Sequence, residues 1–191
     1  MQPTKRSSAN SHAPAAAQVP ARPLHPVRFL ALFALCFLLL FGLSLAPFVK
    51  PAILAFSQML VKTSGAFIGL CGGNAMVEGA VLRDRSTGFA IEMKNGCNAI
   101  DVTFLLWSAV LAFPASWKQK AKGILWGTLA IHVVNFVRFV SLFYLGRYNL
   151  SLFEFAHAYL WQSLILLDTL VVFWLWAQLV SRSAPAPHAA Q

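Results

Sequence analysis

Four long apolar segments determine what kind of fold this chain can adopt. The first, residues 29–46 (FLALFALCFLLLFGLSLA), contains 18 residues without a charge. As a helix it covers about 27 Å at 1.5 Å per residue, close to the thickness of the hydrocarbon core of a bilayer. The other three segments lie near residues 98–115, 124–145 and 158–180. We therefore predict about four transmembrane helices.

The composition agrees with this class. The 191 residues are 58% hydrophobic and 11% charged, which argues against a separate soluble domain with its own core. We expect an all-α integral membrane protein with a single membrane-embedded domain, residues 27–181. Residues 1–26, rich in Ser, Ala, Pro and Gln, and residues 182–191 are expected to be disordered cytoplasmic tails. The net charge of +9 does not indicate nucleic-acid binding, because the basic residues are scattered and border the apolar segments.

The segment between the first two predicted spans is more polar and has a different sequence pattern. Residues 52–70 place apolar side chains on one helical face and Gln58, Lys62 and Gly65 on the opposite one. This pattern favours a helix lying in the membrane interface, with a fifth span as the alternative. The stretches VEGAVL and FAIEMK, separated by the turn-like RDRSTG, predict a short β-hairpin that rests on the interfacial helix or on the bundle.

Basic residues suggest the orientation. The loop SWKQKAKG carries three lysines, and the N-terminal tail is also basic. Both are therefore expected in the cytoplasm, which agrees with four spans and conflicts with five. Residues 50–96, including the hairpin, then lie on the extracytoplasmic side.

Few ionisable residues fall within the predicted spans, and each costs roughly 2.5 to 3.5 kcal/mol on insertion scales. Helix-rise arithmetic places Arg138 about 10 Å below the outer end of its helix, at the same level as Cys97 and His157, which we expect at the outer starts of their own helices. Asn95-Gly96 predicts a turn before Cys97, with Asn98 as the helix N-cap and Asp101 at the position of a capping-box acid.

This arrangement supplies the groups that acyl transfer requires. The positive pole of a helix and the Arg138 guanidinium both favour the Cys97 thiolate, which is a nucleophile. Arg138 can orient the thiolate or stabilise an oxyanion, and His157 can transfer a proton near neutral pH. Together these residues predict transfer through a thioester. The cysteines at 36, 71 and 97 lack paired C-x-x-C spacing, so we expect no zinc site and no cofactor.

Structural alternatives stay open for the same residues. Cys71 and Cys97 can form a disulfide, since both fall outside the membrane in this orientation. Arg138 can pair with Asp101, and His157 can anchor the interface beside neighbouring aromatic residues.

Two further polar residues are predicted at mid-bilayer. His132 and Asp168 fall at the same depth by helix-rise arithmetic and are expected to form a buried structural pair. His132 also shares a helical face with Asn135 and Arg138 because the three recur at three-residue spacing.

Three segments carry a family resemblance: NGCNAID, VVNFVRFVSLFYLG and EFAHAYLWQ. In order and spacing they resemble the exosortase/archaeosortase family of membrane cysteine transpeptidases, specifically its compact exosortase H type. The resemblance implies Cys97 as nucleophile, Arg138 as the catalytic cation and His157 as the third catalytic residue. Asn98, Asp101 and Asn135 are then expected to support the site or to contact substrate.

The resemblance also implies partners and a location. The substrate would be a membrane-anchored secreted protein whose C-terminal sorting signal combines a short motif, a transmembrane helix and a basic end. The enzyme would cleave at the motif and transfer the new C-terminus to an acceptor nucleophile or to water, without a metal. It would be a multi-pass protein of the bacterial inner membrane, with its active site on the extracytoplasmic side. The alternatives are a noncatalytic membrane scaffold and, more weakly, a small transporter using Asp101, Arg138 and Asp168.

Overall fold

The computed structural model describes residues 25–182, which form six α-helices, one π-helical turn and three β-strands. The helices are α1 (Pro26–Ser44), α2 (Lys50–Leu70), α3 (Ile100–Ala112), α4 (Trp117–Tyr148), α5 (Leu150–Phe155) and α6 (Trp161–Arg182), with the π turn at Ala156–Leu160 between the last two. The strands are β1 (Ala75–Glu78), β2 (Val81–Asp84) and β3 (Ala90–Glu92). The predicted tails, residues 1–26 and 182–191, lie outside the described residues apart from their inner ends, where Pro26 and Arg182 belong to helices.

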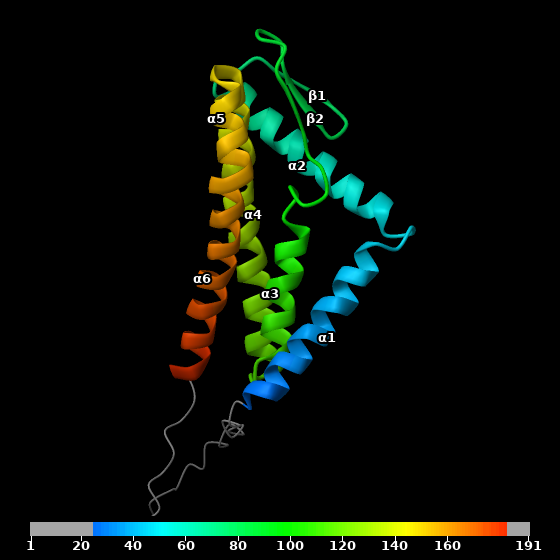
Figure 1. Ribbon diagram of the computed structural model, residues 1–191, viewed down its shortest axis with the longest axis vertical. Helices are drawn as coiled ribbons and strands as arrows, with labels where there is room; N and C mark the ends of the chain where they lie inside the picture. Colours follow the sequence, from blue (N-terminus) through cyan, green and yellow to red (C-terminus); the bar gives the residue numbers. More distant parts are fainter. Residues whose placement is uncertain (1–24, 183–191) are drawn as a thin grey trace, which may run out of the picture.

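α3, α4 and α6 run close to the long axis, whereas α1 and α2 are both inclined to it, and α2 leads toward the end that carries the strands (Figure 1). We call this the sheet end. The first and last described helices both reach the opposite end, as expected for a chain that crosses four times.

The helices that are long and apolar enough to cross a membrane differ slightly from the four spans predicted from the sequence. α1, α2, α4 and the continuous segment Leu150–Arg182 are long and apolar enough to cross a membrane, whereas α3 has 13 residues. The predicted span 98–115 is shorter than expected because Ala99 adopts a left-handed conformation and Phe113 is extended before Pro114. Whether α2 crosses the bilayer or lies in its interface stays a prediction.

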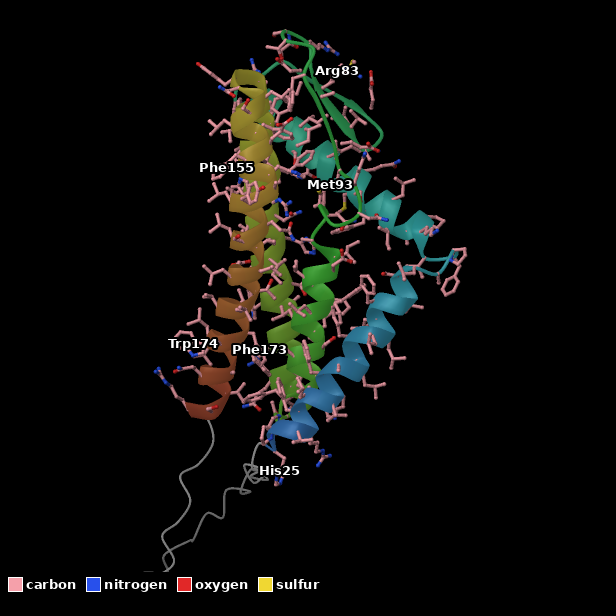
Figure 2. All side chains as sticks on the ribbon, viewed as in Figure 1. His25, Arg83, Met93, Phe155, Phe173 and Trp174 are labelled. Carbon is pink, nitrogen blue, oxygen red and sulfur yellow. The ribbon has the colours of Figure 1, made fainter. Side chains whose placement is uncertain are left out.

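The outer surface of the bundle is apolar. α1 has no buried residue, and Leu38 and Leu39 are about two-thirds exposed, at 66% and 64%. Figure 2 shows Trp174 on the outer side of α6 and Phe173 on the inner side, where Phe173 contacts Phe29 of α1. Because apolar surface of this extent is unfavourable in water, it fits a lipid environment. The predicted class, an all-α integral membrane protein with a small β element, is confirmed.

The sheet has three strands, so the predicted two-stranded hairpin is wrong in number. The strands are antiparallel in the order β1-β2-β3. VEGAVL does not form one strand, because Gly79 has φ +62° and makes a two-residue turn with Ala80. The sheet packs on α2 as expected: Leu82 is fully buried, and a Cβ added to Gly65 of α2 would meet Val77 Cγ2 at 2.5 Å.

Asp84 fastens the sheet to α4. Its buried Oδ2 accepts hydrogen bonds from the Thr87 hydroxyl at 2.6 Å and the Thr87 backbone N–H at 3.0 Å, and lies 3.0 Å from Nε of Arg147. Nearby, the ring of Phe89 packs directly against Gly146 of α4, where no Cβ intervenes. The sheet is therefore fixed at both α2 and α4.

The Asp84 contacts predict a pH-dependent contribution to stability. The Thr87 hydroxyl, the backbone N–H groups of Thr87 and Ser86 and the charge of Arg147 lower the pKa of Asp84 below its ordinary value. Since the folded pKa is depressed, the stabilisation is complete above about pH 4 and is lost as the pH falls through the folded pKa. Asp84→Asn should lower the free energy of unfolding by about 2 to 4 kcal/mol at pH 7.

Thermal unfolding in detergent measures this difference. The control is Glu78→Gln, which removes the exposed Glu78–Arg83 pair at 3.8 Å and should change stability by less than about 1 kcal/mol. A difference between wild type and Asp84→Asn that persists unchanged below the folded pKa would contradict this account.

Candidate active site

Cys97 lies in a tight turn that leads into α3. Its backbone N–H donates to the carbonyl of Lys94 at 3.0 Å, and Gly96 has φ +86°, which a glycine adopts without strain. The N-cap of α3 is Ala99, so the prediction of Asn98 as N-cap is wrong. Because the left-handed Ala99 intervenes, the helix begins at Ile100, three residues after Cys97.

Asn98 instead links α3 to α2. It is 1% exposed, and its Nδ2 donates to Oγ of Ser57 at 3.1 Å while its Oδ1 accepts from the backbone N–H of Ile100 at 3.2 Å. Asp101 lies in the first turn of α3 but makes no capping-box hydrogen bond, so that prediction is wrong as well. The turn that carries Cys97 is therefore held by the Asn98 side chain.

His157 lies in a π-helical turn rather than at the start of a helix. The predicted helix start near residue 158 is wrong because the helical segment begins at Leu150, whose first turn is capped by Asn149 accepting from the N–H of Leu152 at 3.1 Å. The ring of Phe153 stacks on the imidazole, with centroids 5.7 Å apart and planes at 13°. π turns widen a helix locally and are frequent at functional sites.

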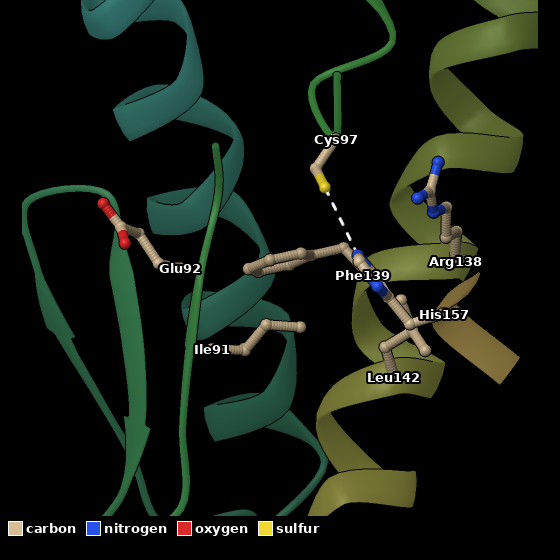
Figure 3. Close-up of a pocket in the computed structure, with 7 residues that line it drawn as sticks. All are labelled: Ile91, Glu92, Cys97, Arg138, Phe139, Leu142 and His157. Carbon is tan, nitrogen blue, oxygen red and sulfur yellow. Dashed lines mark hydrogen bonds between the residues drawn. The ribbon is translucent and has the colours of Figure 1, made fainter. Parts of the chain in front are cut away.

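Cys97, Arg138 and His157 line one small cavity (Figure 3). Cys97 Sγ and His157 Nε2 are 3.5 Å apart, and the Arg138 side chain reaches the same cavity from α4. Ile91, Glu92, Phe139 and Leu142 complete the lining. The cavity holds about 20 Å³, enough for a water molecule. Three polar side chains from three separate segments thus meet at one point near the sheet end.

Arg138 is buried without a compensating acid. It is 3% exposed, and its Nη1 has no hydrogen-bond partner among residues 25–182. None of the ion pairs in this part of the chain involves Arg138, so the alternative of a structural Arg138–Asp101 pair is not realised. A buried guanidinium in this situation strongly favours an anion beside it, either a thiolate or the oxyanion of an acyl-transfer intermediate.

The other intramembrane polar residues do not line this cavity. His132 Nε2 lies 3.5 Å from the Thr103 hydroxyl, while its Nδ1 and Oδ2 of Asp168 are buried without partners in the described chain. The predicted His132–Asp168 pair is therefore wrong: equal depth does not make two side chains face each other. Asn135 is 1% exposed, and neither its Nδ2 nor its Oδ1 has a hydrogen-bond partner within residues 25–182.

The cysteines are not bridged. Cys36, Cys71 and Cys97 are all free, and Cys71 is exposed, so the alternative of a Cys71–Cys97 disulfide is not realised. Within residues 25–182 no three His, Cys, Asp or Glu side chains lie close enough to hold one metal ion.

Comparison with known protein families shows the family of this chain. A family model described as transmembrane exosortase (Exosortase_EpsH) matches residues 25–175, well over half of the 191-residue chain. The chain belongs to the transmembrane exosortase family. The family prediction is thus confirmed. A search of curated proteins and a search of solved structures each found no match.

Several residues around the exosortase cavity are not predicted from the sequence. Phe153 precedes His157 by four residues, a spacing that indicates contact once both are placed on one helix. That signal was hidden because the helix was expected to begin after His157. Ile91 and Glu92 are brought to the cavity by β3, whose position depends on the sheet packing on α2.

The Cys97–His157 distance predicts a thiol whose reactivity depends on the imidazole. His157→Ala should slow alkylation of Cys97 by iodoacetamide about tenfold at pH 7, because His157 can accept the thiol proton. Arg138 cannot replace it as a base, since a guanidinium stays protonated. Mass spectrometry of a Cys36→Ala background, labelled in detergent, measures the rate at each remaining thiol.

Cys71 serves as the control within the same molecule. It is exposed and should react equally fast with and without His157. Equal rates at Cys97 in the two proteins would show that the imidazole does not activate the thiol.

Proposed function

We propose that this exosortase is a membrane-embedded cysteine transpeptidase that cleaves C-terminal sorting signals of secreted proteins through a thioester. The observation that carries the proposal is the 3.5 Å approach of Cys97 Sγ to His157 Nε2 in a cavity that Arg138 also lines. A thiol beside an imidazole and a buried cation is a suitable arrangement for acyl transfer.

In the first half of the reaction, His157 takes the thiol proton and Cys97 Sγ attacks the carbonyl carbon of the scissile peptide bond. The carbonyl oxygen becomes an oxyanion, which the Arg138 guanidinium stabilises. The C–N bond then breaks, His157 returns its proton to the leaving amine, and the acyl group stays on Cys97 as a thioester.

In the second half, an acceptor nucleophile or water attacks the thioester carbonyl. His157 removes a proton from the attacking group, Arg138 again stabilises the oxyanion, and the C–S bond breaks. His157 then gives this proton to the departing sulfur, so that Cys97 is restored as a thiol. The product leaves with its new C-terminus joined to the acceptor or, where water attacks, as a free carboxyl group. No net oxidation or reduction occurs.

The location of the site suggests the kind of substrate. The cavity lies toward the sheet end, and both described termini lie at the opposite end of the bundle. Basic residues next to α1 and in the loop before α4 favour a cytoplasmic position for this opposite end. We therefore place the sheet end outside the inner membrane. A motif just outside the membrane helix of a substrate would meet Cys97 at this depth.

A noncatalytic scaffold is the remaining alternative. In a scaffold, a buried Arg138 would be expected to pair with an acid that specifies helix packing, yet no such partner occurs in residues 25–182. The unpaired guanidinium beside a free thiol supports an enzyme instead.

Substitution of the nucleophile tests the proposal. Co-expression with a secreted protein that ends in a short motif, an apolar helix and a basic tail should give a truncated product. Cys97→Ala should reduce this processing more than about 10³-fold, because no other group in the cavity can form the thioester. Immunoblotting measures both the product and the abundance of the enzyme.

Cys71→Ala is the matched control and should process normally, since Cys71 is exposed and outside the cavity. Hydroxylamine added to the wild type should release the substrate as a hydroxamate, the expected product of a thioester. Undiminished processing by Cys97→Ala at equal abundance would refute the proposal.

A further inference from the structure

The third strand of the sheet has a free edge. β3 is the last strand in the order β1-β2-β3 and pairs on one side only, with Leu82 opposite Ile91. The N–H of Met93 donates to the carbonyl of Ala80, and the N–H of Asp84 donates to the carbonyl of Phe89, both at 2.8 Å. In an antiparallel ladder every second residue bonds to the partner strand, so Phe89, Ile91 and Met93 face β2. Ala90 and Glu92 therefore direct their backbone groups away from β2.

Three backbone groups on this edge are unpaired. The carbonyl of Glu92 accepts from the N–H of Lys94 at 3.2 Å. The N–H and carbonyl of Ala90 and the N–H of Glu92 have no partner among the described residues, and both residues are exposed. An unpaired edge is a template for another extended chain.

The free edge faces the proposed nucleophile. Ile91 and Glu92 line the same cavity as Cys97 and His157, and Figure 3 shows β3 between the β1–β2 hairpin and Cys97. Only residues 93–96 separate β3 from Cys97, and two turns within them shorten that distance, with Lys94 N–H to Glu92 and Cys97 N–H to Lys94. The distance between edge and thiol is thus fixed by a short, hydrogen-bonded segment.

The size of the cavity limits how a substrate can bind. At about 20 Å³ it accepts a water molecule but cannot enclose a peptide. A polypeptide substrate must therefore lie along the outside and present a single carbonyl to Cys97. An extended chain does this naturally, since it advances about 3.3 Å per residue and exposes its carbonyls at regular intervals.

We propose that the cleavage motif of the substrate binds as an added β-strand along β3, hydrogen-bonded to the N–H and carbonyl of Ala90 and the N–H of Glu92. This inference rests on the proposed function and assigns the substrate-binding surface. Main-chain hydrogen bonds hold the motif extended, and alternate side chains face the protein and can be selected. The shortness of β3 and the charges of Glu92 and Lys94 oppose edge-to-edge pairing of two copies.

A series of synthetic peptides tests the proposal from the substrate side. The peptides cover the cleavage segment of the secreted protein whose processing depends on Cys97, and each carries one N-methylated backbone amide. With the detergent-solubilised full-length enzyme, KM should rise about tenfold when the methylated amide is the one whose N–H donates to the Ala90 carbonyl, and should stay within about twofold at the two adjacent positions. A single sensitive amide is expected because the Ala90 carbonyl is the one free acceptor that this edge offers among the described residues, and the adjacent N–H groups of an added strand point away from β3.

A pair of variants tests it from the enzyme side. Ala90→Pro removes the free N–H without breaking a bond to β2 and should raise KM about tenfold with little change in kcat. Ala90→Val keeps the N–H and is the matched control, with a KM near that of the wild type.

The outcomes distinguish this inference from the proposed function. If the unmodified peptide is cleaved in a Cys97-dependent manner but no single N-methylation raises KM, strand addition is refuted and the transpeptidase proposal stands. If Cys97→Ala cleaves the unmodified peptide as well as the wild type does, the proposed function itself fails.

Discussion

The site is built around the positive charge of Arg138, whose guanidinium is buried without an acidic partner among the described residues. Arg138 is 3% exposed, its Nη1 is unpaired within residues 25–182, and it lines the cavity that contains the Cys97 sulfur. Placing an unpaired cation in a membrane protein is unfavourable by several kcal/mol, which the rest of the fold must offset. In return, the cation stabilises any negative charge that forms beside it, on sulfur or on a carbonyl oxygen.

The remaining structure brings the other groups to this cation. α4 extends for 32 residues and fixes the depth of Arg138. Asn98 fastens the cysteine turn to Ser57 of α2, and the Asp84–Arg147 pair fastens the sheet to the end of α4. Phe153 stacks on His157 and also contacts Phe89 of the sheet, with centroids 5.4 Å apart. Sheet, cysteine turn and π turn are therefore connected by direct contacts around one cavity.

The sequence predicted the features that depend on local pattern. Apolar segments of near-bilayer length identified α1, α4 and α6, and the helix rise brought Cys97, Arg138 and His157 to one level. It did not predict features set by contacts between distant residues. The start of α3 depends on the left-handed Ala99 and on the Asn98–Ser57 bond across 41 positions, and neither has a local signal. Similarly, helical depth placed His132 and Asp168 together but could not specify the direction in which each side chain points.

Comparison of Arg138→Gln with the wild type, in both stability and substrate processing, separates a catalytic role of the guanidinium from a structural one. If the guanidinium is present to stabilise developing negative charge, its removal should leave the unfolding temperature in detergent unchanged or higher, because an uncompensated buried charge has been deleted. Processing of the secreted substrate per folded molecule should fall about 10² to 10³-fold. A variant that unfolds more readily yet processes normally per folded molecule would show that Arg138 holds the helices together and has no catalytic role.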